Sequence, residues 1–209
     1  MRRRRWPCVP VDRGIVELIV SIGAVKLGEF TLASGARSSV YVDLREFPMH
    51  PREFREAVRR MASRAGELMG STGAEVIAGV ATGGIPWAIG VALELGAPAT
   101  YVRPEAKGHG TSRRVEARVA GRRVLIVDDV ATTGGSLAAA IEALRGAGAS
   151  VKAALVVVDR LQGARERLAG LGVPLYSLAT LRDILEYMAG RGLGDPYLLE
   201  RALAEVGAP

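Results

Sequence analysis

Short runs of consecutive apolar residues alternate along this chain with longer segments in which apolar residues recur every three or four positions. The short runs are typical of strands buried in a parallel sheet, and the periodic segments are typical of amphipathic helices. Strands that alternate with helices predict an α/β fold, in which a parallel sheet is flanked by helices. The pattern predicts strands at residues 75–80, 99–103, 124–127, 151–158 and 174–178, and helices at 50–70, after 81–84, and at 136–147, 161–170, 180–188 and 196–206.

The N-terminal part of the chain follows a different pattern. Asp12 is a suitable N-cap for a helix whose apolar residues share one face, namely Ile15, Leu18, Ile19 and Ile22. Two segments of short strands joined by Gly/Ser turns are then expected. The predicted organisation is a basic, proline-interrupted tail at 1–10, a helix and small sheet at 11–48 with strands within 24–35 and 39–45, and an α/β core at 49–209.

Composition narrows the functional classes. The 209 residues suit one domain with a sizeable core, and a formal charge of +6 favours anionic ligands without by itself indicating nucleic-acid binding. Cys8 is the only cysteine, which excludes an intrachain disulfide and a zinc site built from cysteines.

Residues 76–93 carry no charge, but Gly83, Gly84 and Pro86 interrupt them, which favours a strand, a loop and a helix over a membrane span. We find no secretion signal and expect a cytoplasmic protein.

The segment VLIVDDVATTGGS, residues 124–136, carries the clearest chemistry. A buried strand is expected to end at two adjacent carboxylates, Asp128 and Asp129, before a loop of small residues and a helix from about Leu137. Ligands bind at the carboxyl ends of strands in open α/β sheets, and such a loop directs backbone N–H groups at a phosphate. The carboxylates would accept hydrogen bonds from vicinal hydroxyls, so the segment suits a sugar phosphate. The simpler alternative is a solvated acidic strand end and a loop that only caps a helix.

Two further segments suggest anion binding. Residues 81–84 follow a strand and begin a helix, so they form a second possible anion site, or else a plain turn. Residues 103–114 are polar, contain glycine and are long enough for a lid, or else are a solvated charge run.

Lysine is rare, and only Lys26, Lys107 and Lys152 occur among 28 basic residues. Each lysine therefore marks a candidate position where arginine would not serve.

Residues 124–136 resemble the phosphoribosyl pyrophosphate (PRPP) signature of type I phosphoribosyltransferases: two hydrophobic residues, a variable pair, two acids, then Thr-Thr-Gly-Gly-Ser. The resemblance implies the fold of that family, a parallel sheet flanked by helices with a small N-terminal hood. It also implies that Asp128 and Asp129 hold the ribose hydroxyls of PRPP. The same resemblance assigns the 5′-phosphate to Val130, Ala131, Thr132, Thr133, Gly134, Gly135 and Ser136, and the pyrophosphate to Ala81, Thr82 and Gly83.

Other segments are similar to orotate phosphoribosyltransferases. A Lys, then Gly-x-Phe-Thr-Leu-x-Ser-Gly and Tyr-x-Asp-x-Arg within 26–45 resemble their hood, which implies that Lys26 and Phe30 face orotate. Residues 103–110 resemble their catalytic loop, although Pro104 stands where many members carry a second basic residue. The resemblance assigns Arg103, Lys107 and His109 to PRPP, and Arg160, with help from Thr132, to the orotate carboxylate. A local structural pairing of Asp159 with Arg160 is the alternative for that arginine.

The resemblance to orotate phosphoribosyltransferases implies transfer of phosphoribose from PRPP to orotate, which gives orotidine 5′-monophosphate and pyrophosphate in de novo pyrimidine (UMP) biosynthesis. It implies catalytic roles for Lys107, His109 and Asp129, and Mg²⁺ carried by PRPP rather than bound directly by the protein. A homodimer is expected, in which residues 103–114 complete the neighbouring site, with no nucleic-acid or membrane partner.

Two alternatives stay open. One is a phosphoribosyltransferase for another base, and the other is a PRPP-sensing regulator that binds nucleic acid through Arg2–Arg5. Too few residues precede Lys26 for a separate DNA-binding domain as well as a hood.

Overall fold

The computed structural model describes residues 11–31, 37–104 and 114–206. Its centre is a five-stranded sheet with the strand order β4-β3-β5-β6-β7, in which every neighbouring pair is parallel. In that order the strands span Ala99–Val102, Val76–Val80, Arg123–Ala131, Ser150–Asp159 and Leu175–Thr180. The predicted parallel α/β core is therefore confirmed.

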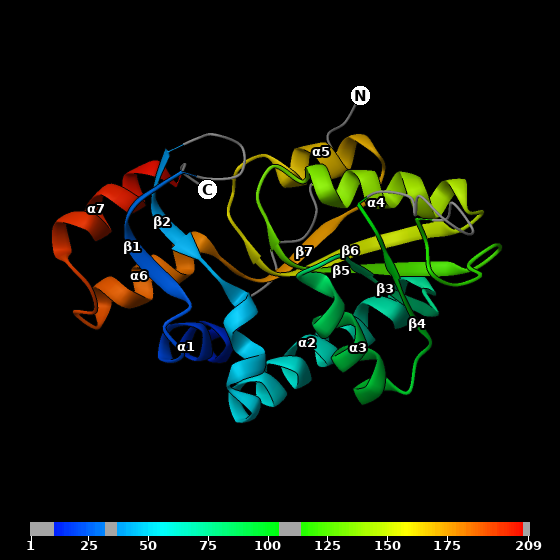
Figure 1. The fold of residues 1–209 in the computed structure, drawn as a ribbon, viewed down its shortest axis with the longest axis horizontal. Coiled ribbons are helices and arrows are strands. Elements are labelled where there is room, and N and C mark those ends of the chain that lie inside the picture. Colours follow the sequence, from blue (N-terminus) through cyan, green and yellow to red (C-terminus); the bar gives the residue numbers. More distant parts are fainter. Residues whose placement is uncertain (1–10, 32–36, 105–113, 207–209) are drawn as a thin grey trace.

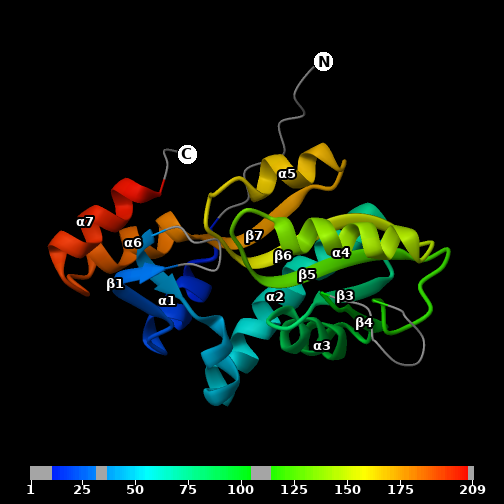
Figure 2. The same cartoon turned by 45° about the horizontal axis from the view of Figure 1, so that its top comes forward.

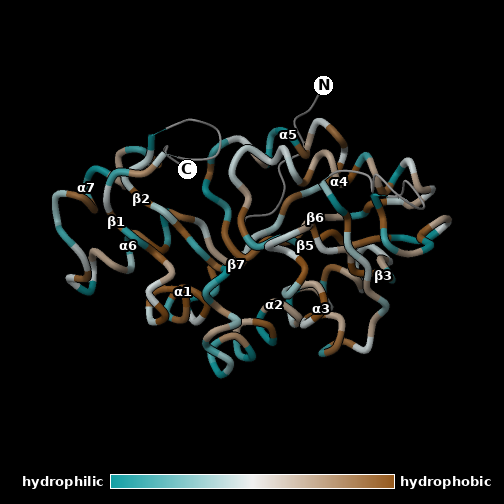
Figure 3. Tube along the Cα trace, in the orientation of Figure 1, coloured by the Kyte–Doolittle hydropathy of each residue, from teal (hydrophilic) through white to brown (hydrophobic). Residues whose placement is uncertain are grey.

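Helices cover both faces of this sheet (Figure 1). Helices α2 (Pro51–Thr72) and α3 (Gly84–Leu95) lie on one face, and α4 (Gly135–Gly146) and α5 (Ala164–Gly170) lie on the other. Successive residues of β5 enter the two apolar cores in turn, so that Leu125 packs with α2 and α3 whereas Ile126 packs with α4 and α5. The hydrophobic colour along the central strands in Figure 3 follows from this burial on both faces, which explains the uninterrupted apolar runs in the sequence.

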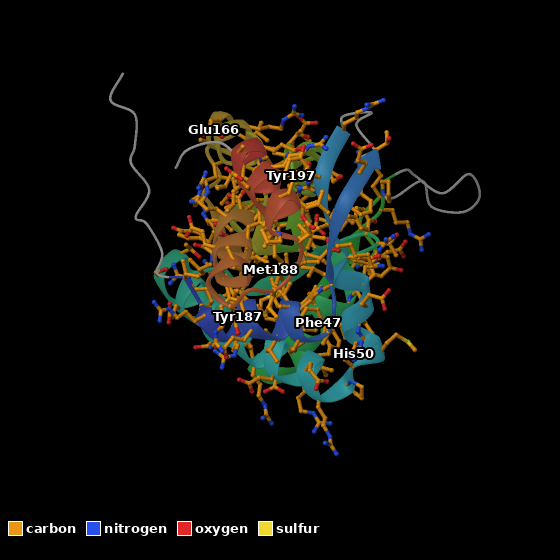
Figure 4. All side chains as sticks on the ribbon, turned by 90° about the vertical axis from the view of Figure 1, so that its left-hand side faces the viewer. Phe47, His50, Glu166, Tyr187, Met188 and Tyr197 are labelled. Atoms are coloured by element: carbon orange, nitrogen blue, oxygen red, sulfur yellow. The ribbon has the colours of Figure 1, made fainter. Side chains whose placement is uncertain are left out.

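A smaller layer contains the two ends of the described chain (Figures 1 and 2). Helix α1 (Arg13–Ser21) precedes an antiparallel hairpin of β1 (Val25–Thr31) and β2 (Arg37–Val42). Helices α6 (Leu181–Gly190) and α7 (Pro196–Glu205) close the chain, and α7 packs against both hairpin strands, as Figure 4 shows from that side. We call the β1–β2 hairpin the hood. The predicted division at residue 48 stays a prediction, but the structure shows that the far end of the chain supports the hood.

Several predicted boundaries need correction. Strand β5 does not end at Val127 but continues to Ala131, because Asp128 and Val130 still pair with residues of β6. Helix α4 begins at Gly135, one residue before the predicted range 136–147. The two carboxylates therefore lie within the last part of a paired strand, where the backbone fixes their positions.

The second hood strand and helix α5 also differ from the prediction. Strand β2 ends at Val42 rather than Arg45, and a 3₁₀ helix (η1, Leu44–Met49) follows, because the Asp43 side chain accepts a hydrogen bond from the Arg45 N–H and caps that turn. Helix α5 begins at Ala164 rather than Leu161, whose φ of 59° is incompatible with a helix. Residues 32–36 lie outside the described part of the hood.

Two predicted helix starts are confirmed. The Asp12 side chain accepts the Ile15 N–H at 3.1 Å as the N-cap of α1, and Pro51 opens α2. Within the described ranges, no helix is long and apolar enough to cross a membrane.

Candidate active site

The acidic pair at the end of β5 has a fixed geometry. Oδ1 of Asp128 accepts a hydrogen bond from the Asp129 N–H at 3.0 Å, and Oδ1 of Asp129 accepts one from the Val130 N–H at 2.8 Å. Asp128 is buried, and this burial, together with the neighbouring Asp129 carboxylate, raises the pKa of Asp128 well above its ordinary value. A ligand that donates hydrogen bonds to these carboxylates would replace solvation that the fold has removed.

The turn after β3 lies directly against these acids. A Cβ atom added to Gly83 would come within 2.3 Å of Asp129 Oδ2, and one added to Gly84 would come within 2.7 Å of the Val127 carbonyl oxygen. Only glycine permits this approach. The two predicted anion-binding turns therefore meet at one place, at the carboxyl ends of adjacent parallel strands.

The loop after β5 leads into a helix N-terminus. Gly134 adopts a φ of +74° and precedes the first residue of α4. A Cβ atom at Gly134 would lie 3.0 Å from the Ala164 backbone, so both its dihedrals and its packing require glycine. The first N–H groups of a helix have no partner within the helix, so the start of α4 presents donors and positive potential to an anion.

These elements enclose a cavity of about 670 Å³ beside the hood. Its walls are the end of β2 and the start of η1, the turn after β3, the loop after β5, and the residue after β6. The lining residues are Tyr41, Val42, Asp43, Leu44, Arg45, Thr82, Gly83, Asp128, Asp129, Val130, Ala131, Thr132, Thr133, Gly134, Gly135, Ser136, Leu137 and Arg160.

Arg160 reaches this cavity from the end of β6. Its Nη2 donates to the Ser38 hydroxyl at 3.1 Å and to the Val40 carbonyl at 3.3 Å, so the guanidinium is tied to the hood. Burial lowers the pKa of Arg160, and its Nε is buried with no hydrogen-bond partner in the described ranges. An acceptor such as a ligand carboxylate would complete the coordination of this cation.

The alternative pairing of Arg160 with Asp159 is not what the structure contains. Asp159 is fully buried and accepts hydrogen bonds from Arg165 Nε at 2.6 Å and from the Leu161 N–H at 2.9 Å. Arg165 is therefore the ion-pair partner of Asp159. Arg160 instead contacts the hood and lines the cavity.

Four predicted site residues lie beside the cavity lining rather than in it. Lys26 and Phe30 are on β1, where Lys26 pairs with Tyr41 and the Phe30 ring lies 5.5 Å from the Tyr41 ring. Ala81 and Arg103 line a smaller neighbouring cavity of about 290 Å³, which shares Gly135 and Ser136 with the larger one.

Arg103 already has protein partners in this structure. Its Nε donates to Glu116, and its Nη2 donates to the Tyr101 hydroxyl at 3.4 Å. The hydrogen bond to Glu116 is the main reason that the pKa of Arg103 is raised. Lys107 and His109 lie outside the described residues, so the geometry of their predicted roles stays open.

Three polar residues of the cavity wall, Tyr41, Asp43 and Arg45, are not among the predicted site residues. Arg45 Nε and Nη2 donate to the two oxygens of Asp43 at 2.7 and 2.8 Å, and Nη2 also donates to the Tyr41 hydroxyl at 2.9 Å. The Arg45 hydrogen bond lowers the pKa of Asp43. The signal in the sequence was the alternation Tyr-x-Asp-x-Arg, which places the three side chains on one side of the chain.

Comparisons with known proteins agree with this geometry. Residues 50–171 match the phosphoribosyl transferase domain family. The orotate phosphoribosyltransferase of Aeropyrum pernix is 47% identical over 178 residues, which cover 85% of this chain and 95% of the relative. The crystal structure of the orotate phosphoribosyltransferase from Aeropyrum pernix has a TM-score of 0.75 at 45% identity and covers 84% of this chain and 98% of that chain.

The Mycobacterium tuberculosis orotate phosphoribosyltransferase in complex with PRPP has a TM-score of 0.66 at 32% identity, with 83% of this chain and 98% of that chain covered. Family model, sequence and fold agree with one another, and the two glycine turns and the acidic pair meet at the carboxyl ends of β3 and β5. The chain belongs to the orotate phosphoribosyltransferases of the phosphoribosyl transferase family.

Proposed function

We propose that this protein is the enzyme that transfers phosphoribose from PRPP to orotate, forming orotidine 5′-monophosphate and pyrophosphate for pyrimidine biosynthesis. The observation that carries the proposal is the single cavity in which the acidic pair, two glycine turns and the buried Arg160 meet. A phosphate, two hydroxyls and a carboxylate each find the complementary protein group there. We place the reaction in the cytoplasm.

PRPP would occupy the half of the cavity formed by β3, β5 and α4. Asp128 and Asp129 would accept hydrogen bonds from the ribose hydroxyls, and residues 130–136 would bind the 5′-phosphate through N–H groups and the α4 N-terminus. Residues 81–83 would contact the pyrophosphate. Because Asp128 and Asp129 sit on a paired strand, the ribose would be held with little freedom, which favours reaction at its anomeric carbon.

Orotate would lie between the ribose and the hood. Arg160 would bind its carboxylate with help from Thr132, and Lys26 and Phe30 would approach from β1. The bond between the anomeric carbon and the pyrophosphate breaks as orotate nitrogen bonds to that carbon. Negative charge therefore grows on the leaving group, where Lys107 and His109 would stabilise it.

Mg²⁺ would partly neutralise the pyrophosphate charge when bound. In the described ranges, no group of three or more His, Cys, Asp or Glu side chains is arranged to hold a metal ion. Asp128 and Asp129 would support the metal only indirectly, and we assign it mainly to PRPP oxygens. The protein would orient this complex through the ribose and phosphate contacts.

We also propose a homodimer in which residues 103–114 complete the neighbouring site. Helix α3 exposes three apolar side chains, Ile89, Leu93 and Leu95, by 42%, 78% and 37%. This apolar surface lies beside the edge strand β4, and the chain continues from β4 into residues 103–114. A second copy on this surface would cover it and would bring each loop near the other site. We expect Leu93→Glu to shift the dimer toward monomer in light scattering, whereas Tyr197→Glu, at an exposed residue on α7, should not. A dimer unaffected by Leu93→Glu would place the interface elsewhere.

Subunit mixing tests the shared site directly. Lys107→Ala and Asp129→Asn chains, each inactive, should recover activity after exchange, because each mixed dimer would contain one site with both defects and one with neither. The recovered activity should approach about one quarter of the parental value at full exchange. If exchange is verified and no activity returns, each loop serves its own subunit.

A turnover assay with PRPP, Mg²⁺ and orotate, uracil, adenine or hypoxanthine in turn tests the function itself. Orotate should be the preferred base because Arg160 requires a carboxylate. Preference for another base would show a different phosphoribosyltransferase. Salt-dependent DNA binding without turnover of any base would instead show a PRPP-sensing regulator.

A further inference from the structure

Glu205, at the C-terminal end of α7, binds Ser39 on the hood strand β2. Its Oε2 accepts the Ser39 N–H at 2.8 Å, and its Oε1 accepts the Ser39 hydroxyl. Arg201, one turn earlier on α7, pairs with Glu205 at 3.8 Å and with Glu29 of β1 at 3.2 Å. The last helix therefore holds both strands of the hood at the same level.

Ser39 needs a partner because the hairpin is irregular at this point. The register pairs Leu27 with Val40 and then Phe30 with Ser38, so Ser39 has no paired residue on β1. Bulges of this kind interrupt the ladder and leave the extra residue unpaired. Glu205 replaces the missing ladder contact by accepting two hydrogen bonds from Ser39, and hydrogen bonds to a charged acceptor are stronger than neutral ones.

The residue that Glu205 holds lies between the two anchors of Arg160. Arg160 Nη2 donates to the Ser38 hydroxyl and to the Val40 carbonyl, and the Ser38 hydroxyl donates to the same carbonyl at 2.9 Å. A displacement of β2 at Ser39 would move both acceptors together. The direction of the guanidinium thus depends on a contact made by the last helix.

We propose that Glu205 is a positioning residue for recognition of the orotate carboxylate, acting through Ser39 and the β2 anchors on Arg160. This inference rests on the proposed function, which assigns Arg160 to that carboxylate. Glu205 is not part of the cavity lining, so it would not touch the substrate. Its charge also favours the buried guanidinium, because burial lowers the pKa of Arg160 and Glu205 opposes that effect.

The hydrogen bonds of Glu205 persist at neutral pH. Partial burial alone would raise the pKa of Glu205, but hydrogen bonds from Ser39 and the charge of Arg201 outweigh it and lower the pKa. The carboxylate is therefore ionised wherever the enzyme is assayed near neutrality. The effect of substitution can be measured at a single pH.

The test compares Glu205→Ala, Glu205→Gln and, as the matched control, Glu200→Ala, since Glu200 is an exposed glutamate on the same helix. We expect Glu205→Ala to raise the KM for orotate about tenfold, as for loss of a charge-assisted contact, with kcat and the KM for PRPP changed less than about twofold. Glu205→Gln keeps one acceptor for Ser39 and should lie between Glu205→Ala and the parent. Glu200→Ala should match the parent.

A double-mutant cycle with Arg160→Ala separates positioning from general stability. In the Arg160→Ala background, Glu205→Ala should no longer change the orotate KM. Equal rises in both KM values, an effect of Glu200→Ala, or additive effects in the cycle would overturn the inference. If Glu205→Ala does not fold, as judged from its melting curve, the same comparisons on Glu205→Gln decide. An inactive parental enzyme would refute the proposed function and this inference together, whereas an active parent with unselective variants refutes this inference alone.

Discussion

Gly83→Ala is the substitution for which the structure gives the sharpest expectation. The backbone of Gly83 has φ −61° and ψ −36°, which alanine adopts without strain. The added Cβ atom would nevertheless lie 2.3 Å from Asp129 Oδ2 and 2.8 Å from Oδ1. Carbon and oxygen cannot approach that closely, so the carboxylate must turn away from its position in the cavity.

Gly83→Ala should have a small effect on the free energy of unfolding and a large effect on kcat/KM for PRPP. Asp129 is a side chain at a cavity wall and can move, and replacement of glycine by alanine at a compatible backbone gains about 0.4–1 kcal/mol from the unfolded state. The free energy of unfolding should therefore change by less than about 1 kcal/mol. Loss of the hydrogen bonds from a ribose hydroxyl to a charged carboxylate costs about 1.5–3 kcal/mol, equivalent to a ten- to hundredfold loss in kcat/KM for PRPP.

The assay pairs denaturant unfolding with steady-state kinetics on three variants. Gly84→Ala is the contrasting variant, because its Cβ atom would meet the Val127 backbone carbonyl at 2.7 Å, and it should destabilise the fold by about 1–3 kcal/mol. Gly70→Ala is the control, because nothing lies within 4 Å of its added Cβ atom. Gly83→Ala with parental kcat/KM, or with a stability loss as large as that of Gly84→Ala, would refute the proposed role of this close approach.

Three further outcomes are expected. Arg160→Ala should raise the KM for orotate about ten- to hundredfold and leave the KM for PRPP nearly unchanged, whereas equal losses would indicate local unfolding. Lys107→Ala should lower kcat about 10²- to 10³-fold, with a smaller effect on the PRPP Kd, and a loss below about threefold would show a solvated charge. Asp128→Asn should abolish efficient turnover yet raise the free energy of unfolding at pH 7. The reason is that burial raises the pKa of Asp128 in the fold, so ionisation above its ordinary value of 3.8 costs stability. The gain should shrink as the pH falls to that value, and a gain independent of pH would contradict this cause.

The core and the strand–loop–helix unit proposed to bind phosphate could be predicted because their signals are local. The apolar run 124–127 identifies a buried strand, and the glycines and threonines that follow it form one strand–loop–helix unit. Gly83 and Gly134 were singled out with the correct turns. What the sequence could not show is that Gly83 approaches the Asp129 carboxylate of another strand, since that distance depends on how β3 and β5 pair.

The end of β5 was placed wrongly for a physical reason. Two adjacent acids normally mark the point where a strand meets solvent, because burial of an ionised group is costly. Here Asp128 stays paired with β6 and buried, and its raised pKa records that cost. A site that needs a carboxylate at a fixed position departs from the usual pattern at that residue.

The half of the site proposed to recognise the base depends on contacts distant in sequence. Arg160 and Ser38 are 122 residues apart, and Glu205 and Ser39 are 166 residues apart. No periodicity or motif in a single chain reports such pairs. An arginine at a strand end marks Arg160 as a candidate for a carboxylate, and the resemblance assigns it to orotate, but neither identifies its contacts with the hood, and the partner of Asp159 is Arg165.

This difference separates the two binding functions physically. The proposed PRPP contacts lie on one strand–loop–helix unit and on glycines packed into the sheet, so a change there would disturb the rigid core. The proposed contact with the orotate carboxylate depends on a two-stranded hood that α7 holds through side chains on its surface. Substitutions on the inner face of α7 should therefore alter the choice of base while PRPP binding persists, because that helix contacts the two hood strands, and β2 in turn anchors Arg160.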